Sequence, residues 1–595
     1  MMLESLKQIG DLYIDDTSIL SEQIRKKFKK EPVILEVVFD FDQRKVSYQM
    51  RRFQKELVEE YRWIGHTFSA TREAIARLTF TNPKYFPSTI VNLIYKLSNS
   101  NECKRLVTML QEIKDDFITE NNTLQDDLLS YVRNIKDYEV VFYTICVKKK
   151  GELIELAKQT EYTKAIKYMI SPESSRTKGF CHVCGEEKDV FTDPAFESGT
   201  LLKMYIVDQP GYLSGISTKS EKTSLLRTFS ICPDCRYSLI IGEKKVSRDF
   251  ATNIGNLRVT VIPKIGLLRN SAKEKLTTIF KDFIDISAGL EGISKIDEKL
   301  QEGMITDDWY SLSLIFGERE QAKFNYYGTI QEIPLTQITR LRSMMRQISN
   351  SALEIWPDDK REQWILTLNQ IAGIIPLRMF SGKVQFYPLI ELLTALMKNY
   401  KYPYRKLVDL AVISSYAHRF GSYEGLTLKS SNQDFSLVHT TLKFNYLILL
   451  MQKMGMLTEN IPATYEAHID EDVNKWITQM QYEPWKTALF LMGYLIGKIG
   501  NEQYNRGDER KSILDKIDFK GMKWDRIIRL TGDIMNSLRN YRILKYNEGT
   551  YHEMCKLIDQ SRQIIERNDP SENLFYILTG YSFATYGAIR RGDKT

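Results

Sequence analysis

The stretch GFCHVCGEE, residues 179–187, places two cysteines in a C-x-x-C arrangement with a glycine directly behind the second. A second C-x-x-C pair lies in SICPDCRYS, residues 230–238. Zn²⁺ in structural sites takes four soft ligands tetrahedrally, with sulfur at about 2.3 Å, and a C-x-x-C turn lets two sulfurs meet one ion. The spacing therefore predicts one closed structural zinc site with four ligands: Cys181, Cys184, Cys232 and Cys235.

Other interpretations of the pairs are that they are unrelated or that one is a redox dithiol. Redox pairs start a helix after a strand, and neither pair shows that context clearly in the sequence. A catalytic zinc is disfavoured because four cysteines leave no open coordination position. His182 lies inside the first turn and is expected to point away from the metal. The segment between the pairs is then an insertion that the metal clamps at its base.

The patterning changes on either side of the cysteine pairs. Before them, the apolar runs 33–41 and 44–50 predict a hairpin, helical patterns follow over 52–135, and 139–147 predicts another strand. After them, 257–263 predicts a strand, and the runs 310–316 and 323–330 predict a second hairpin. From about residue 333 onward helical spacing dominates.

The last part of the chain predicts four helices joined by short links, which is typical of an antiparallel bundle. Their expected ranges are 484–505, 522–545, 549–567 and 571–590. Gly493 and Gly497 share one helix face and are expected to let a neighbouring helix approach closely. The fold class is thus α+β. It combines a mixed N-terminal α/β region, an inserted four-cysteine zinc-binding module, and a mostly helical C-terminal half that ends in a bundle. The expected domains are 1–170, 171–262, 263–480 and 481–595.

The composition is that of a folded protein, with 595 residues and a mildly basic net charge of +7 that permits a nucleic-acid partner without requiring one. Seven cysteines make no disulfide scaffold and suit a reducing cytoplasm with one metal site. The opening MMLESLKQIG does not read as a signal peptide, and the longest apolar run, 487–497, is shorter than a membrane helix requires. We expect a cytoplasmic protein with no membrane partner.

Several segments in a fixed order resemble one known family. These are GFCHVCGEEKDV from 179, MYIVDQPGYLSG from 204, FSICPDCRYSLIIGEKKV from 229, LRVTVIPKI from 257 and FLMGYLIGKIGNEQ from 490. Together with the hairpin and helix from 310, they are similar to the large subunit of type I-B CRISPR Cascade complexes. The likeness covers most of the chain and is weakest before about residue 140; the order and spacing carry it, not one motif.

This resemblance implies a role. The expected function is that of a non-catalytic subunit of an RNA-guided surveillance complex that recognises the protospacer-adjacent motif in double-stranded DNA, supports R-loop formation and helps recruit a helicase-nuclease. The implied partners are CRISPR RNA, target DNA, and the backbone, handle-binding and small subunits. The C-terminal part resembles a small subunit, which some relatives also make from an internal start. The candidate starts in this chain are Met451, Met454, Met456 and Met480.

Three basic groups are candidate nucleic-acid contacts. The first follows the helix that begins near 522, where cations flank a predicted apolar stripe of Trp524, Ile527, Ile528, Met535 and Leu538. The second lies in the loop between the cysteine pairs, and the third on the helix 333–348. Solvated faces, a loop without a ligand and surface salt bridges are the respective alternatives. The residues concerned are Lys523, Arg526, Arg529, Arg539 and Arg542; Lys219 and Lys222; and Arg340, Arg342 and Arg346.

The sequence shows no phosphate-binding P-loop, no H-E-x-x-H motif and no adjacent His-Asp pair. We therefore expect no enzyme activity. Two other functions stay open. One is a stand-alone nuclease or polymerase-like enzyme with a structural zinc, and the other is a zinc-stapled scaffold that does not contact nucleic acid.

Overall fold

The computed structural model describes most of the chain, and it divides into two compact units. Unit 1 comprises Met1–Ala251 with Glu318–Tyr326, and unit 2 comprises Thr252–Gly317 with Tyr327–Thr595. The predicted boundary at 480/481 falls inside unit 2. The described residues are 2–14, 28–63, 77–118, 123–170, 176–191, 196, 200–205, 229–265, 310–320, 323–364, 366–457, 465, 469–507 and 512–592.

Unit 1 contains a five-stranded mixed sheet. Its path is β2-β1-β4-β3, with β5 added beside β4. Strand β1 pairs antiparallel with β2, which confirms the hairpin predicted around Asp42, and parallel with β4. Buried on both faces, β1 reads as a nearly continuous apolar run. The strands are β1 Glu31–Asp40, β2 Lys45–Arg52, β3 Thr79–Phe80, β4 Tyr138–Lys149 and β5 Glu152–Glu155.

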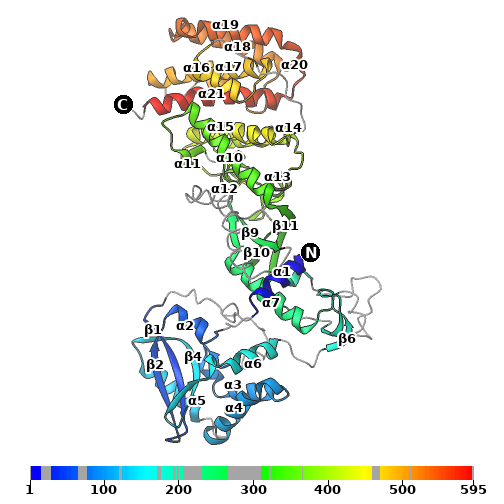
Figure 1. Cartoon of the computed structure of the whole chain (residues 1–595). Helices are drawn as coiled ribbons and strands as arrows, with labels where there is room; N and C mark the ends of the chain where they lie inside the picture. Colours follow the sequence, from blue (N-terminus) through cyan, green and yellow to red (C-terminus); the bar gives the residue numbers. More distant parts are fainter. Residues whose placement is uncertain are drawn as a thin grey trace. The chain divides into compact units, whose positions relative to one another are not determined.

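Helices accompany this sheet, and α3, α4 and α6 pack together. Their apolar residues recur at helical spacing, as in α4, where Leu106, Leu110 and Ile113 are buried and the remaining positions are mostly polar. Figure 1 shows them in blue and cyan beside the strands. The helices are α2 Lys55–Glu60, α3 Ser88–Leu97, α4 Lys104–Phe117, α5 Thr123–Asn134 and α6 Thr160–Ile170.

The remainder of unit 1 is built around the cysteine pairs. It consists of a two-stranded hairpin, β6 Arg176–Phe180 with β7 Glu187–Phe191, and the long helix α7 Pro233–Asp249. The first helix of the chain, α1 Met2–Leu12, packs along α7. The sequence did not predict this partnership.

Unit 2 begins with a four-stranded sheet in the order β11-β10-β9-β8. Strand β9 pairs antiparallel with β10, and β10 lies beside β11, which confirms the predicted second hairpin. The strands are β8 Ala251–Ile254, β9 Leu257–Ile265, β10 Tyr310–Glu320 and β11 Lys323–Pro334. A separate small hairpin joins β12 Met379–Phe380 to β13 Lys383–Val384.

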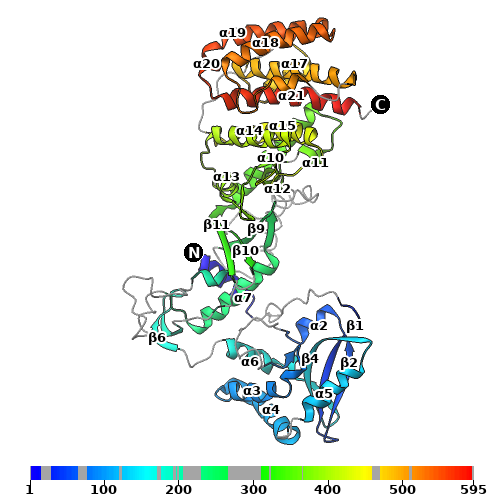
Figure 2. The same cartoon turned by 180° about the vertical axis from the view of Figure 1, so that it is seen from behind.

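The rest of unit 2 is helical and stacked in layers, as Figures 1 and 2 show from opposite sides. Helices α18 and α19 lie next to α17, α17 lies on α21, and α21 lies on α14 and α15. The helices are α10 Leu335–Ile355, α11 Arg361–Trp364, α12 Leu368–Ile374, α13 Tyr387–Lys398, α14 Tyr404–Phe420, α15 Gln433–Lys453, α16 Glu471–Gln479, α17 Pro484–Asn505, α18 Trp524–Asn540, α19 Leu544–Gln560, α20 Arg562–Arg567 and α21 Pro570–Gly592.

Glycines set the spacing between α17 and α21. A Cβ at Gly493 would lie 1.8 Å from the carbonyl oxygen of Ile577, and one at Gly580 would lie 1.8 Å from that of Phe490. The two backbones are therefore close enough that only glycine fits at these points. The predicted packing role of Gly493 and Gly497 is confirmed.

The α+β class, the mixed N-terminal region, the cysteine cluster and the helical C-terminal half are all as predicted. The apolar stripe of α18 needs a correction. The structure buries Ile527, Leu530, Ile534 and Leu538, whereas the predicted Ile528 is 41% exposed. The described part of the chain contains no helix with both the length and the hydrophobicity to span a membrane.

Candidate metal centre and nucleic-acid surface

The first cysteine pair occupies the turn of the β6–β7 hairpin. The backbone N–H of Cys181 donates to the carbonyl of Glu186 at 2.9 Å, and that of Gly185 donates to the carbonyl of Cys181 at 2.8 Å. Gly185 has φ +75°, a left-handed conformation that glycine adopts without a steric penalty. The turn therefore holds Cys181 and Cys184 on one side, as the following glycine predicted.

The second pair sits at the start of α7. Cys232 is the residue that precedes the helix, Pro233 occupies its first position and Cys235 lies in its first turn. The sequence did not show this helix-start context. A helix N-terminus carries partial positive charge, which would offset part of the negative charge of thiolate ligands on a metal ion here. A bridge between Phe191 and Ile231 fastens the approach to α7 onto the first hairpin.

The two pairs meet in one cluster. The sulfur atoms of all four cysteines lie within 4.8 Å of one another. Tetrahedral Zn–S geometry requires sulfurs about 3.8 Å apart, so small adjustments would bring them around one ion. Cys181, Cys232 and Cys235 are buried and Cys184 is half-buried. The donor set therefore fits a soft metal ion in a closed, four-coordinate site.

His182 is engaged elsewhere, as predicted. Its Nδ1 accepts a hydrogen bond from the backbone N–H of Ser230 at 2.9 Å, and its own backbone N–H donates to the carbonyl of Ser230 at 2.9 Å. The ring also stacks near Phe229, with centroids 6.2 Å apart. His182 thus fastens the two cysteine segments together without joining the ligand set.

The pKa values of the clustered thiols shift in opposite directions. The pKa of Cys181 is lowered because the thiols of Cys232 and Cys235 donate to its sulfur, and the backbone N–H of Cys232 donates to it at 3.3 Å. The hydrogen bond to Cys181 raises the pKa of Cys232 to about 11, and raises that of Cys235 as well. The first thiolate therefore forms at Cys181, and a metal ion would replace the protons that the other sulfurs hold.

Helix α7, which carries the second pair, is anchored by α1. A Cβ at Gly10 would lie 1.8 Å from the carbonyl oxygen of Ser238, and one at Gly242 would lie 1.9 Å from that of Leu6. The hydroxyl of Ser238 donates to Asp11 at 2.6 Å. These contacts fix the helix that presents Cys235. Gly10 and Gly242 were the sequence signals for these contacts.

The predicted basic residues of the C-terminal bundle are exposed, on α18 and at its ends. Arg526 forms an ion pair with Asp518 at 2.8 Å. The other four make no ion pair with any residue that the structure describes; they are Lys523, Arg529, Arg539 and Arg542. Arg542 follows the helix at φ +59°, in the turn before α19. The cluster is therefore a solvated face with cations that remain available for a ligand.

The three arginines of α10 do not share one surface. Arg340 is exposed and donates to the carbonyl of Met454 at 3.3 Å, whereas the side chain of Arg342 is buried at 8% exposure. Arg346 is half-buried. Burial of Arg342 results from its place beside Leu341 and Met345 on the inner face of the helix. The expectation that all three face a nucleic acid together does not fit this geometry. Lys219 and Lys222 lie outside the described residues.

Family models match the chain in three consecutive pieces. They are described as the N-terminal, central and C-terminal domains of CRISPR-associated protein TM1802 (cas_TM1802), and they match residues 2–168, 178–333 and 366–595 respectively. No curated protein matches the chain. The four cysteines fall within the central domain, and α18 falls within the C-terminal one. With all three domains present in order, the chain belongs to the CRISPR-associated protein TM1802 family.

Proposed function

We propose that this chain is the non-catalytic large subunit of an RNA-guided surveillance complex of the type I-B Cascade class. In this role it recognises the protospacer-adjacent motif in double-stranded DNA, supports R-loop formation and helps recruit the helicase-nuclease. The observation that carries the proposal is the family match over three consecutive domains. The likeness of the segments around both cysteine pairs and of 490–503 to the type I-B large subunit supports the finer assignment.

The metal in this proposal is Zn²⁺, held by Cys181, Cys184, Cys232 and Cys235 in a structural role. A tetrathiolate offers the soft ligands that Zn²⁺ accepts and leaves no position for water or substrate. The cluster joins a hairpin turn to a helix start, so metal binding closes the base of the segment between the pairs. The ion would stabilise that junction and take no part in a reaction.

The nucleic-acid surface in this proposal includes α18. Arg529 and Arg539 are exposed and have no ion-pair partner within the described ranges, so their guanidinium groups are available to phosphate. A carboxylate-paired arginine, such as Arg526, would first have to break its ion pair. We therefore assign the phosphate contacts of this helix chiefly to Arg529 and Arg539. The partners are CRISPR RNA, target DNA and the other complex subunits.

Co-expression with the neighbouring genes of its operon tests the assignment. We expect the chain to co-purify with a guide RNA and the backbone subunits as one stable assembly. Cleavage of DNA by the isolated chain with magnesium would instead identify a stand-alone enzyme and overturn the proposal. Failure to co-purify with any RNA or subunit would also count against it.

A charge-removal variant tests the surface. In the assembled complex, the double variant Arg529→Gln/Arg539→Gln should weaken DNA binding and reduce the slope of log affinity against log salt by about one per lost phosphate contact. The control is Lys475→Gln, which removes an exposed cation that is already paired with Glu471 at 2.8 Å. Equal salt slopes for the wild type and the double variant would exclude α18 from the interface.

A further inference from the structure

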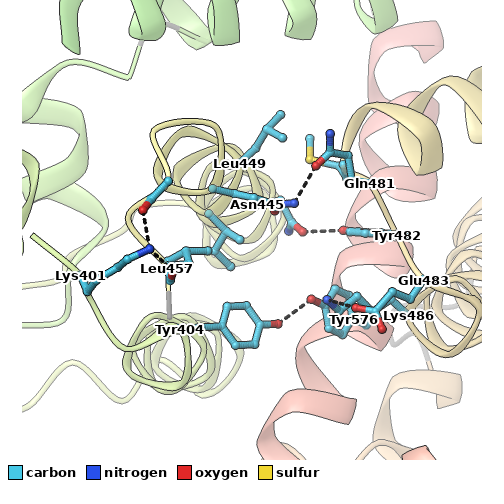
Figure 3. A pocket seen from close by; sticks show the side chains of 14 residues that line it. Lys401, Tyr404, Asn445, Leu449, Leu457, Gln481, Tyr482, Glu483, Lys486 and Tyr576 are labelled. Carbon is cyan, nitrogen blue, oxygen red and sulfur yellow. Dashed lines mark hydrogen bonds and ion pairs between the residues drawn. The ribbon is translucent and has the colours of Figure 1, made fainter. Parts of the chain in front are cut away.

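Unit 2 contains a cavity whose polar groups are all engaged with one another. It has a volume of about 210 Å³ and lies among α14, α15, α17 and α21. Figure 3 shows Lys486 beside Glu483 and Tyr576. The ammonium of Lys486 pairs with Glu483 at 2.7 Å, and Lys401 donates to the carbonyls of Gly455 and Leu457. These lysines therefore have protein partners and leave little capacity for a ligand.

A second cavity in the same unit is different. It has a volume of about 360 Å³, within the range of small-molecule sites, and is bordered by the start of α16, the middle of α17, the end of α21 and the turn after α10. One of its cations is already neutralised, because Arg590 pairs with Asp359 at 2.6 Å and with Asp358 at 3.4 Å. That pairing fixes one wall.

Three groups that can donate hydrogen bonds border this cavity, and none of them pairs with a carboxylate that the structure describes. Within the described residues, Lys498 makes no hydrogen bond or ion pair, and its ammonium lies 5.0 Å from the centre of the Tyr494 ring. The hydroxyl of Tyr494 has no hydrogen-bond partner in those ranges either, although the residue is only 5% exposed. The Nε–H of Arg591 donates to the carbonyl of Gly587 at 2.9 Å. Its guanidinium forms no ion pair with a carboxylate in the described part of the chain.

The electrostatics of Lys498 agree with this geometry. Burial lowers its pKa, Arg591 lowers it further, and Asp470 opposes both. A half-buried ammonium without an ion-pair partner carries a desolvation cost, and a bound anion would offset part of it. Lys498 thus contrasts with Lys486, which lies on the same helix and has its carboxylate in place.

Acceptors face the same cavity. Asp470 caps the start of α16 by accepting the backbone N–H of Asp472 at 3.0 Å, and Asp472 forms no ion pair with a described residue. Apart from the pairs of Arg590 with Asp358 and Asp359, the acidic and basic groups of this cavity form no ion pair with one another in the described part of the chain. Aromatic side chains, among them Trp356 and Phe583, form part of the wall. A complementary ligand carries an anionic group, hydrogen-bond donors and a flat ring.

We propose that this cavity binds a nucleoside monophosphate, either free or as one unit of a single strand. Lys498, Arg591 and the Tyr494 hydroxyl receive the phosphate, because ammonium, guanidinium and phenol all donate to its oxygens. Asp470 and Asp472 accept from the exocyclic amino group of the base, as acidic side chains do in base recognition. Trp356 and Phe583 add apolar surface to the wall, and their rings already pack on other aromatic side chains. This site is separate from the metal centre and from α18, and it does not depend on the proposed function.

The test is calorimetric titration of the isolated full chain at low salt with four probes. They are 5′-CMP, 5′-AMP, inorganic phosphate and a single-stranded tetranucleotide. We expect a nucleotide-containing probe to bind, and Lys498→Met and Arg591→Gln each to weaken it about tenfold. Lys475→Gln, which changes an exposed cation outside this cavity, should not. Tighter binding of the tetranucleotide identifies a strand unit, and tighter binding of a mononucleotide identifies a free ligand.

Thermal unfolding distinguishes a lysine that binds the nucleotide from one that stabilises the fold. Lys498→Met should raise the Tm of the unliganded chain, because it removes a half-buried charge that has no ion-pair partner among the described residues, and should abolish the Tm increase that the nucleotide causes. Lys486→Met should lower the Tm, because it strands Glu483. The proposal is overturned if no nucleotide probe binds, if Lys498→Met and Arg591→Gln retain full affinity, or if inorganic phosphate binds as tightly as the nucleotides.

Discussion

At the residue scale, Lys443 of α15 should make stability depend on pH. It is 8% exposed, and burial lowers its pKa from 10.5 to about 8. Between these values the unfolded chain binds more protons than the folded one, so stability should rise as pH increases from about 8 to 10.5. Below that window the lysine is charged in both states, and its burial cost is fully present. His439, one turn away, stays neutral because burial lowers its pKa to about 3.

Lys443→Met isolates this contribution. At pH 7 the variant should unfold with a free energy higher by up to about 3 kcal/mol, and its stability should no longer rise between pH 8 and 10.5. Hydrogen exchange of α15 amides across this pH range measures both effects. An equally steep rise in the variant would show that another group is responsible.

A second residue-scale prediction concerns the cysteine cluster. Cys181→Ser removes the sulfur to which Cys232 and Cys235 donate. We expect the variant to lose its metal and to become protease-sensitive first around the β6–β7 hairpin and α7, because metal binding and local folding are coupled. Elemental analysis and limited proteolysis measure this outcome. Cys555→Ser, at a half-buried cysteine outside the cluster, is the control. Full metal content in the Cys181 variant would contradict a four-cysteine site.

At the element scale, the close approach of α17 and α21 should not tolerate a side chain. Gly493→Ala would place a methyl group 1.8 Å from the carbonyl oxygen of Ile577. We expect a loss of about 1–3 kcal/mol, since the helices must separate. The matched control is Gly532→Ala on α18, where the added methyl meets nothing within 4 Å and should stabilise by about 1 kcal/mol. Urea denaturation monitored by hydrogen exchange of α17 compares them, and equal stabilities would refute the packing argument.

Local pattern predicted many of these elements, because strand alternation and helical spacing are properties of neighbouring residues. It misplaced the break between α18 and α19, since α19 begins at Leu544, inside the range 522–545 that was predicted as one helix. The hairpin around Asp42 and the helix beginning at Pro484 follow directly from such patterns. The stripe of α18 was misassigned because both Ile528 and Leu530 are apolar, and only the packing partner decides which one turns inward. The sequence did not predict the burial of Arg342 for the same reason, because the pattern of charges does not show which face of α10 packs against the rest of the protein.

Local spacing of apolar residues does not predict contacts between segments that are distant in the sequence. Cysteine spacing predicted one long-range contact because metal chemistry demands it, and the four sulfurs do converge. No sequence motif of this kind predicts that α1 packs on α7, or that Tyr494 and Arg591 border one cavity. The glycines at 10, 242, 493 and 580 were the available signal, since a glycine within a helix favours close backbone approach, but they do not name the partner.

At the scale of the whole molecule, the C-terminal bundle is continuous with the helices before it. Asn445 on α15 donates to the hydroxyl of Thr579 at 2.9 Å and accepts from Tyr482 at 2.6 Å. The hydroxyls of Tyr404 on α14 and Tyr576 on α21 are 2.5 Å apart. All these side chains are buried. An internal start at Met480 would separate α21 from these partners.

Fragments of the chain test this continuity. The fragment 481–595 removes Asn445 and Tyr404, the partners of the Tyr482 and Tyr576 hydroxyls, whereas Thr579 keeps its hydrogen bond to the carbonyl of Phe575 at 2.9 Å. It also exposes to water the buried face of α21 that α14 and α15 cover. We expect it to self-associate or to unfold without cooperativity. The fragment 327–595 keeps these partners and should be monomeric with a sharp transition. Light scattering and thermal unfolding by circular dichroism compare the two. A monomeric, cooperatively folded 481–595 would show that the bundle is an independent domain, as expected of a separately made small subunit.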